Sequence, residues 1–498
     1  MEFARHTPFG TLVGRQTRDG YSFLGIPYAE PPIGPLRFCK PIARRRTTAT
    51  VDATEPRPAP LQAVGPTLGL FGDTSPKSVS EDCLYLNVWT PAPDVARRPV
   101  LVHLFGGGFQ RGSATEGVED AAALSNKSDC VIVRVGFRVG VLGFLHLGDV
   151  WGEPYGAGNV GLLDVVAALE WVAENISALG GDPDNVTIFG ISSGAFMATA
   201  LFAIPAARSL FQRAFLQSGS ASRVFDRTSA TDRAREFLAA AGVAIGDRRA
   251  LEALPPDRIL DAEAKILASD LGARNAPGGR ALGIVEDGTT LVEHPLEVFR
   301  RGICRDKPIV LGSTRDESRM WFSLGVMAIP ERREALAAEM DRFFQGKGDA
   351  IFASYRARAP GADLAQLREQ FLTDVVYRLP AVRTALAHAH SGGAAYLFRF
   401  DWAPAGELSS FGAAHGFDEP FVWGVEPSDK LPLMAGSHNA AMVARQMSDA
   451  LVAFARNGAP GWPAVAAPSP LSKIFGGGEE IAALDDLLLT TFEGADRR

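Results

Sequence analysis

The chain has 498 residues, of which 46% are hydrophobic and 21% are charged. This much apolar sequence is enough for a large buried core, and it excludes a disordered tail or a disulfide-stapled miniprotein. The net charge is −7, from 50 Lys and Arg against 57 Asp and Glu, and the basic run Arg44–Arg46 is short. Such a run is typical of a solvated loop, so we expect no nucleic-acid partner.

Two further features bear on the compartment. The N-terminal segment has no basic region followed by an apolar one, and no run of about 18 apolar residues occurs, so we expect no signal peptide and no membrane span. The few cysteines are typical of reduced intracellular thiols. They are Cys39, Cys83, Cys130 and Cys304. We therefore expect a cytoplasmic protein that does not bind membranes.

Short β-branched or aromatic runs recur along the chain, with helical stretches between them. Most of the runs are almost continuously apolar, which favours strands that are covered on both faces. The runs are Pro99–Phe105, Cys130–Phe137, Val186–Phe189, Ala214–Gln217, Pro308–Leu311 and Ala395–Phe400. In Asn159–Leu179 the apolar residues follow the helical period, which predicts a helix. The alternation predicts an α/β fold with a mostly parallel central sheet flanked by helices.

Two longer intervals differ from this pattern. Residues 223–305 and 319–393 are rich in Ala, Arg, Glu and Leu. We expect them to be helical excursions that cover the carboxyl edge of the sheet, where ligands bind in open α/β folds. A last helix is predicted at Ser437–Asn457, because a glycine and a proline follow it. No linker or internal repeat is evident, so the sequence predicts a single domain over residues 1–498.

A candidate nucleophile lies in the segment Gly190-Ile191-Ser192-Ser193-Gly194. The segment follows the run Val186–Phe189 and precedes a helical stretch, which is the strand–turn–helix context that a G-x-S-x-G elbow needs. The tight turn projects the hydroxyl of Ser192 above the sheet, next to the positive end of the helix. The alternatives are a glycine-rich turn with Ser192 as helix N-cap, or Ser193 as the reactive hydroxyl.

A candidate oxyanion hole follows the run Pro99–Phe105. Three glycines, Gly106–Gly108, come directly after this predicted strand, as in the HGGG-type loops that complement a nucleophile elbow. We expect the donors to be the amides of Gly107 and Gly108, joined by that of Ser193. The alternative is a flexible glycine turn without a catalytic role.

A serine nucleophile needs a base, and the base needs an orienting carboxylate. Asp316 and Glu317 directly follow a predicted strand, and position alone does not separate them; we expect one of them to be a surface charge. Among the downstream histidines, His415 lies in a loop of small residues bracketed by glycines, and we favour it. The other three, His388, His390 and His438, belong to or begin predicted helices.

Taken together, these motifs resemble the type B carboxylesterases, the family that includes bacterial carboxylesterases and cholinesterases. The resemblance spans nearly the whole chain. It begins with Phe23–Phe38 and Ser80–Pro91 and continues through GGGFQRGS, GVLGFL, NVGLLD, ALEWVAENI, GGDPDNVTIFG, FQRAFLQSGS, GSTRDES and GAAHGFDEPFVWG. It implies an α/β-hydrolase fold, and it matches the family's catalytic acid to Glu317 and its histidine to His415. It also suggests supporting roles for Ser218 and Asp418.

The sequence departs from the family pattern at several points. Ile191 stands where the family elbow usually has Glu, and Ser193 where it has Ala. We hypothesise that the loss of this buried acid alters the environment of the histidine and leaves Asp418 with a different partner. Cys83 matches a disulfide cysteine of eukaryotic members, but no suitable upstream cysteine exists, so that loop bridge is not expected. Segment Leu68–Val79 lacks the Trp that binds choline, which argues against a cholinesterase.

The sequence therefore predicts a carboxylic ester hydrolase with a Ser192–His415–Glu317 triad and an acyl-enzyme intermediate. Its partner is a small-molecule ester, and we expect no metal and no organic cofactor. We predict that Phe109 and Phe225 are apolar walls of the pocket, with ordinary core aromatics as the alternative. A carbamate or amide hydrolase with the same triad stays open, and so does a non-catalytic adhesion or scaffold member of the family. The sequence does not choose between monomer and homodimer.

Overall fold

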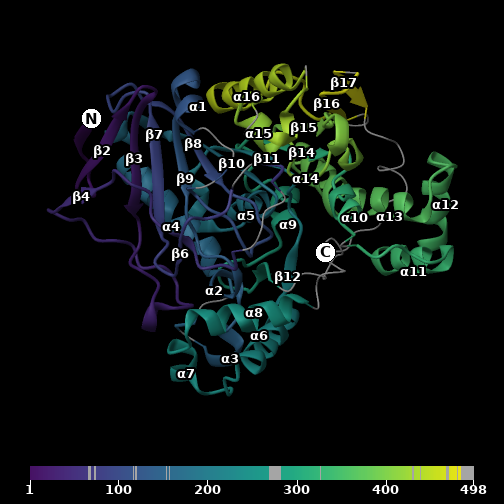
Figure 1. Cartoon of the computed structure of the whole chain (residues 1–498), viewed down its shortest axis with the longest axis horizontal. Helices are drawn as coiled ribbons and strands as arrows, with labels where there is room; N and C mark the ends of the chain where they lie inside the picture. The colour runs from purple at the N-terminus through teal and green to yellow at the C-terminus, as the bar shows by residue number, and fades with distance from the viewer. Residues whose placement is uncertain are drawn as a thin grey trace.

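The computed structural model describes residues 1–483 except 65–68, 72–73, 116, 118–120, 153, 156–157, 269–281, 326, 429–430, 438, 467–469 and 479. Its centre is a thirteen-stranded sheet in the order β1-β2-β3-β7-β9-β8-β10-β11-β14-β15-β16-β17, with β4 beside β2 (Figure 1). These strands are β1 (Glu2–His6), β2 (Thr11–Thr17), β3 (Gly20–Pro27), β4 (Thr50–Asp52), β7 (Tyr85–Thr90), β8 (Arg98–Leu104), β9 (Val131–Val135), β10 (Gly181–Ile191), β11 (Arg213–Gln217), β14 (Ile309–Thr314), β15 (Ala395–Phe400), β16 (Leu471–Phe475) and β17 (Ile481–Ala483).

The middle of the sheet is parallel, from β9 through β8, β10, β11, β14 and β15 to β16. All six predicted strands lie in this part, so the mostly parallel central sheet is confirmed. The sequence did not indicate the antiparallel strands β1, β2, β3 and β7 at the N-terminal side. Exposed residues interrupt β1 and β2, so their apolar runs are short.

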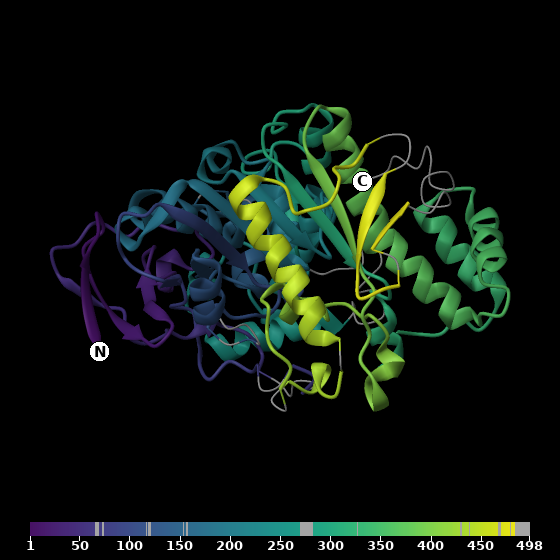
Figure 2. The same cartoon turned by 90° about the horizontal axis from the view of Figure 1, so that it is seen from above.

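Successive residues of each central strand pack against different layers. Ile188, Leu216 and Leu311 join one buried cluster, whereas their chain neighbours Phe189, Phe215 and Val310 join the other. The first cluster includes helices α4 (Val160–Asn175), α5 (Ser193–Leu201) and α14 (Leu379–His390). The second includes α16 (Ala440–Asn457), which lies across the sheet in Figure 2. The core strands are thus covered on both faces, as their continuous apolar character predicts.

The predicted helix Asn159–Leu179 is divided in the structure. Helix α4 is followed by a 3-10 turn, η2 (Ile176–Leu179). This turn ends at Gly180, which has a φ of 87°. The predicted last helix begins three residues later than expected, at Ala440, and ends as expected at Asn457 before Gly458. Shorter elements connect these helices and strands: β5 (Ala59–Pro60), β6 (Val79–Ser80), α1 (Ala121–Ser128), α2 (Gly140–Phe144), α3 (Gly148–Trp151), α15 (Glu419–Val422), η1 (Gly34–Leu36), η3 (Pro205–Leu210), η5 (Gly406–Phe411) and η6 (Pro432–Met434).

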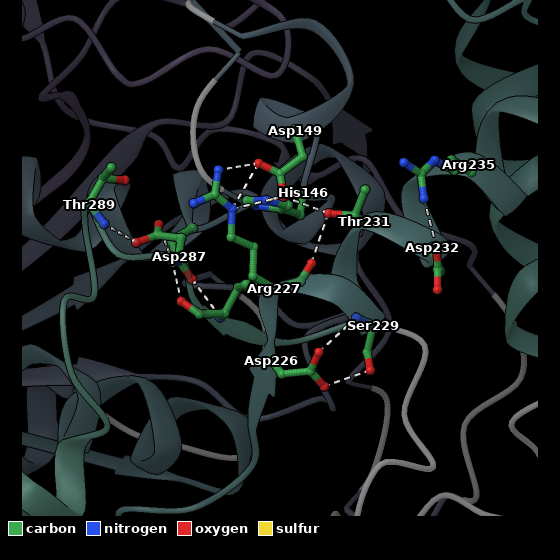
Figure 3. A network of polar contacts seen from close by, with 12 residues as sticks. His146, Asp149, Asp226, Arg227, Ser229, Thr231, Asp232, Arg235, Asp287 and Thr289 are labelled. Carbon is green, nitrogen blue, oxygen red and sulfur yellow. Dashed lines mark hydrogen bonds and ion pairs between the residues drawn. The ribbon is translucent and has the colours of Figure 1, made fainter.

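The first excursion is not purely helical. Its helices are α6 (Arg227–Ala241), α7 (Arg248–Glu252), α8 (Pro256–Ala268) and α9 (Pro295–Arg300), and it also contains a parallel pair of strands, β12 (Val224–Asp226) and β13 (Ile284–Glu286). Two strands of three residues are too short to leave a periodic signal in the sequence. The excursion is fastened to the body by polar contacts, since Arg227 pairs with Asp149 of α3 and Thr231 donates to the same carboxylate (Figure 3).

The second excursion is helical, as predicted. It comprises α10 (Arg319–Ser323), α11 (Arg333–Phe343), α12 (Gly348–Arg358), α13 (Leu364–Thr373), the π-helical turn η4 (Asp374–Arg378) and α14. Helices α11, α12 and α13 project from the sheet at one end of the molecule (Figure 1). No helix among the described residues is both long and apolar enough to cross a membrane.

Candidate active site

Ser192 lies in a sharp turn between the end of β10 and the start of α5. Its backbone has φ 54° and ψ −121°, a strained conformation that L-residues rarely adopt. The turn is possible because both flanking glycines approach the end of β8. A Cβ atom would lie 2.6 Å from the carbonyl oxygen of Leu104 at Gly190 and 2.1 Å from it at Gly194. The pattern therefore fixes where the serine hydroxyl projects.

The structure brings His415 between Ser192 and Glu317. Its Nε2 lies 2.9 Å from Oγ of Ser192, and its Nδ1 lies 2.6 Å from Oε2 of Glu317. The imidazole can therefore accept the serine proton on one nitrogen while it donates to the carboxylate with the other. The amide of His415 also donates to the carbonyl oxygen of Glu317 at 3.3 Å, which ties the two loops together.

The other downstream histidines are placed elsewhere. His388 is buried in α14, where its Nε2 lies 3.0 Å from the carbonyl oxygen of Lys307 and burial lowers its pKa. His390 is the last residue of the same helix. His438 lies outside the described residues. Of the three described downstream histidines, only His415 contacts Ser192.

The two adjacent acids have separate tasks. Glu317 is fully buried, and besides His415 it accepts hydrogen bonds from the Thr314 amide and the Ser218 hydroxyl, each at 2.7 Å. Asp316 points to the other side, accepts from the Ala413 amide at 2.9 Å and pairs with Arg319. The expectation that one acid is a surface charge is wrong, because Asp316 is only 8% exposed. It holds the loop that leads to His415.

The glycine loop after β8 passes beside the serine. A Cβ atom at Gly106 would lie 3.4 Å from Cβ of Ser192. Gly107 and Gly108 have φ angles of 120° and 68°, and a Cβ at Gly107 would lie 2.1 Å from the carbonyl oxygen of Arg111. The amides of Gly107 and Gly108 donate no hydrogen bond to another described residue. Ser193 is the first residue of α5, where an amide has no acceptor within the helix.

Two aromatic rings that the sequence analysis missed flank His415. The ring centroids of Tyr377 and Trp321 lie 4.8 Å and 5.3 Å from that of the imidazole. Trp321 follows Glu317 by only four residues, so its nearness in sequence to the candidate acid could have indicated a place beside the site. Tyr377 gave none, because it comes from η4 in the second excursion. This turn is held by Arg378, which pairs with Asp374 and donates to the Arg315 carbonyl oxygen at 2.8 Å.

Asp418 is a buried acid at the back of the site. Neither carboxylate oxygen makes a well-aligned hydrogen bond to another described residue, although the Gln217 side chain lies close enough to lower the pKa of the acid. Burial, with repulsion from Glu317 as a second cause, raises the pKa of Asp418 to about 7. Ile191, the residue that replaces the acid usual in the family, is itself 3% exposed and packs against Gly106.

The two predicted pocket walls lie near each other. Phe109 is 1% exposed and packs edge-on against Phe144 at 5.0 Å, while Phe225 on β12 is partly buried and lines a cavity. A Cβ atom at Gly283 would lie 2.9 Å from the Phe225 ring and 3.7 Å from the Phe109 ring. In the described part of the chain, no group of three His, Cys, Asp or Glu side chains is arranged to hold a metal ion. The four cysteines are buried, and none of them forms a disulfide.

Comparison with known proteins finds esterases and related hydrolases that match most of the chain. The carboxylesterase family model matches residues 2–471. A para-nitrobenzyl esterase of Bacillus subtilis (strain 168) is 32% identical over 93% of this chain and 91% of that protein. A phenmedipham hydrolase of Pseudarthrobacter oxydans is 31% identical over 96% of each chain, and an acetylcholinesterase of Bungarus fasciatus is 31% identical over 91% of this chain and 79% of that protein.

Solved structures agree with the sequence matches. The crystal structure of a Geobacillus stearothermophilus carboxylesterase at pH 6.2 superposes with a TM-score of 0.84, at 32% identity, over 99% of this chain and 98% of that one. A thermophilic para-nitrobenzyl esterase gives a TM-score of 0.85 at 30% identity, over 99% of each chain. The fold is that of the α/β-hydrolases, and these relatives support carboxylic ester hydrolysis. The chain belongs to the carboxylesterase family.

Proposed function

We propose that this protein hydrolyses carboxylic esters of small molecules through an acyl-enzyme formed on Ser192. The observation that carries the proposal is the continuous chain of hydrogen bonds from the Ser192 hydroxyl through His415 to the buried Glu317. It supplies a nucleophile, a base and an orienting carboxylate within direct contact. We also propose that the whole chain works as one catalytic domain, because the site draws on β10, β14, the His415 loop and the second excursion.

In the first half-reaction, Oγ of Ser192 attacks the ester carbonyl carbon while His415 Nε2 takes the hydroxyl proton. Glu317 holds the Nδ1–H tautomer and stabilises the imidazolium that forms. The tetrahedral oxyanion receives hydrogen bonds from the amides of Gly107, Gly108 and Ser193, and one such donor contributes about 3–4 kcal/mol. The C–O bond to the leaving group then breaks, and the imidazolium protonates the departing alkoxide.

In the second half-reaction, water replaces the serine as nucleophile. His415 takes a proton from that water, which attacks the acyl carbon through the same oxyanion geometry. Collapse of the intermediate returns the proton to Ser192 and releases the carboxylic acid. The whole cycle consumes one ester and one water, yields one acid and one alcohol, and needs no electron transfer and no group other than these side chains and amides.

The test is covalent labelling with a fluorophosphonate, read by intact-protein mass. We expect one label on the wild-type chain and none on Ser192→Ala, with Ser193→Ala as the matched control that still labels. Absence of label on the wild type, or a label that survives Ser192→Ala, contradicts the proposal. A series of p-nitrophenyl esters of increasing acyl length then defines the preferred acyl group.

Rate comparisons distinguish an esterase from a carbamate or amide hydrolase that uses the same catalytic groups. We expect kcat/KM for an ester to exceed that for the carbamate and the amide with the same leaving group. A carbamate turned over faster than the matching ester reverses this assignment while it leaves the roles of Ser192, His415 and Glu317 intact.

A further inference from the structure

A cavity of about 480 Å³ is lined by residues of both excursions. Its walls come from β12 and the segment before it, from α9, from the C-terminal end of α11, and from η4 with the start of α14. The volume is within the range of small-molecule sites. None of the described residues that line it is Ser192, His415 or Glu317, so the triad itself does not form its wall.

The cavity nevertheless adjoins the active site at two of its walls. Val376 lines the cavity, and the ring of the next residue, Tyr377, lies tilted against the imidazole of His415, with the ring centroids 4.8 Å apart. Phe225 also lines it, and the Phe225 and Phe109 rings both lie next to Gly283, with Phe109 directly after the oxyanion glycines. A molecule in the cavity would thus contact Val376 and Phe225, whose neighbours Tyr377 and Phe109 lie beside His415 and the glycine loop.

The charged groups of the lining favour an anion. Four arginines and three carboxylates line the cavity, so the lining carries one positive charge in excess. Asp226 caps helix α6 by accepting from the Ser229 amide at 2.9 Å, and Glu297 pairs with Arg300 at 2.7 Å. Arg342, at the end of α11, makes no hydrogen bond and no ion pair with another described residue. The remaining lining charges are Arg223, Arg383 and Glu286, with His294 as a further titratable group.

Most of the uncharged lining is apolar. It includes Phe225, Phe343, Phe344, Val375, Val376 and Leu379, and the uncharged polar lining residues are Ser222, Ser229 and Gln345. A ligand that satisfies both parts has an apolar body to bury against the rings and a single carboxylate for the guanidinium groups, which match a carboxylate with two parallel hydrogen bonds. A cation would face the excess of arginines, and a bare inorganic anion would leave the aromatic wall uncovered.

We propose that this cavity is a binding site for amphipathic monocarboxylates. The carboxylic acid released by ester hydrolysis has this chemistry, so the acid product itself is one such ligand; this second statement rests on the proposed function. Because the walls come from both excursions, an acid bound there would hold them together beside the catalytic histidine.

The experiment is calorimetric titration of the full-length Ser192→Ala protein with 4-phenylbutyrate and with its neutral analogue 4-phenylbutanamide. We expect one acid to bind per chain, about tenfold or more tighter than the amide, which corresponds to about 1.4 kcal/mol. Arg342→Met should weaken the acid about tenfold and leave the amide unchanged. Arg332→Met is the matched control, because Arg332 is an exposed arginine at the other end of α11 and does not line the cavity.

Each other outcome overturns the proposal. The cavity arginines do not bind the carboxylate if the acid does not bind, or if acid and amide bind equally well. The same conclusion follows if Arg332→Met weakens the acid as much as Arg342→Met does. Wild-type protein phosphonylated on Ser192 should still bind the acid, and loss of binding there would assign the acid to the catalytic site. The comparison of acid with amide needs no cavity variant. Binding to Ser192→Ala does not depend on catalysis, so failure of the proposed function, read as absent esterase activity in the wild type, is a separate result.

Discussion

The carboxyl group of Asp418 is fully buried beside that of Glu317. Burial raises the pKa of Asp418, and repulsion from Glu317 raises it further, to about 7. An acid whose folded-state pKa lies above its unfolded value stabilises the fold at low pH, and this contribution is lost as pH rises through the folded pKa. For Asp418 the loss runs from about pH 4 to about pH 7.

Asp418→Asn should therefore gain stability relative to wild type as the pH increases from 4 to 8, since the asparagine stays neutral. The full span is on the order of 4 kcal/mol at most, from about three pKa units. Denaturant unfolding at several pH values measures it. Asp232→Asn, at an exposed pair on α6, is the control and should leave the pH dependence unchanged. Parallel curves for wild type and Asp418→Asn would show that Asp418 does not titrate in this range.

Replacing each of the two adjacent acids by its amide distinguishes a catalytic role from a structural one. Glu317→Gln should lower kcat/KM by about 10³–10⁴, because the amide no longer holds the required imidazole tautomer or stabilises the imidazolium. Asp316→Asn should lower the melting temperature and change kcat/KM by less than about tenfold, since it weakens the contacts of the loop before His415. Steady-state kinetics with thermal unfolding of both variants is the measurement. An Asp316→Asn enzyme as slow as Glu317→Gln contradicts this division.

The two rings beside His415 should favour the charged imidazolium of the transition state. Ring faces attract cations by about 0.5–2 kcal/mol, so Tyr377→Leu should lower kcat about tenfold with little change in KM. Tyr377→Phe keeps the ring and should stay close to wild type. If both variants lose activity equally, the hydroxyl group rather than the ring face is responsible.

Gly107 should tolerate no side chain. Gly107→Ala should lower kcat by about 10²–10³, because the 2.1 Å approach to the Arg111 carbonyl oxygen forces the loop and its amides to move. Gly152→Ala is a control for backbone strain alone, since Gly152 has a φ of 68° but no atom near its Cβ position. It should cost about 1–3 kcal/mol of stability and leave kcat unchanged. An active Gly107→Ala enzyme would remove this loop from the mechanism.

The sequence predicted the elements whose signal is local. The parallel core strands are buried on both faces and read as continuous apolar runs, so all six were found. Strands β1 and β2 were missed because exposed residues interrupt their apolar runs, whereas in β3 and β7 glycine and polar residues such as Gly25 and Asn87 interrupt them. The elbow, the glycine loop and His415 were predicted from short local motifs, because tight turns after strands require particular residues.

What the sequence left open depends on contacts between distant segments. Asp316 and Glu317 have the same charge and the same strand before them, so position did not separate them and only the family resemblance pointed to Glu317; the turn after β14 decides which one meets His415. Tyr377 reaches the imidazole from 38 positions away along the chain. The cavity is assembled from four separate segments, and neither apolar periodicity nor a short motif records such an assembly.

The backbone of Ser192 has a further consequence. A side chain held at φ 54° and ψ −121° costs about 1–3 kcal/mol, which glycine would not incur. The parallel strands on both sides and the helix behind must supply that energy in every folded molecule, whether or not substrate is present. Selection of variants for thermal stability alone would therefore favour glycine at position 192, and the molecule would become more robust by losing its reactive group.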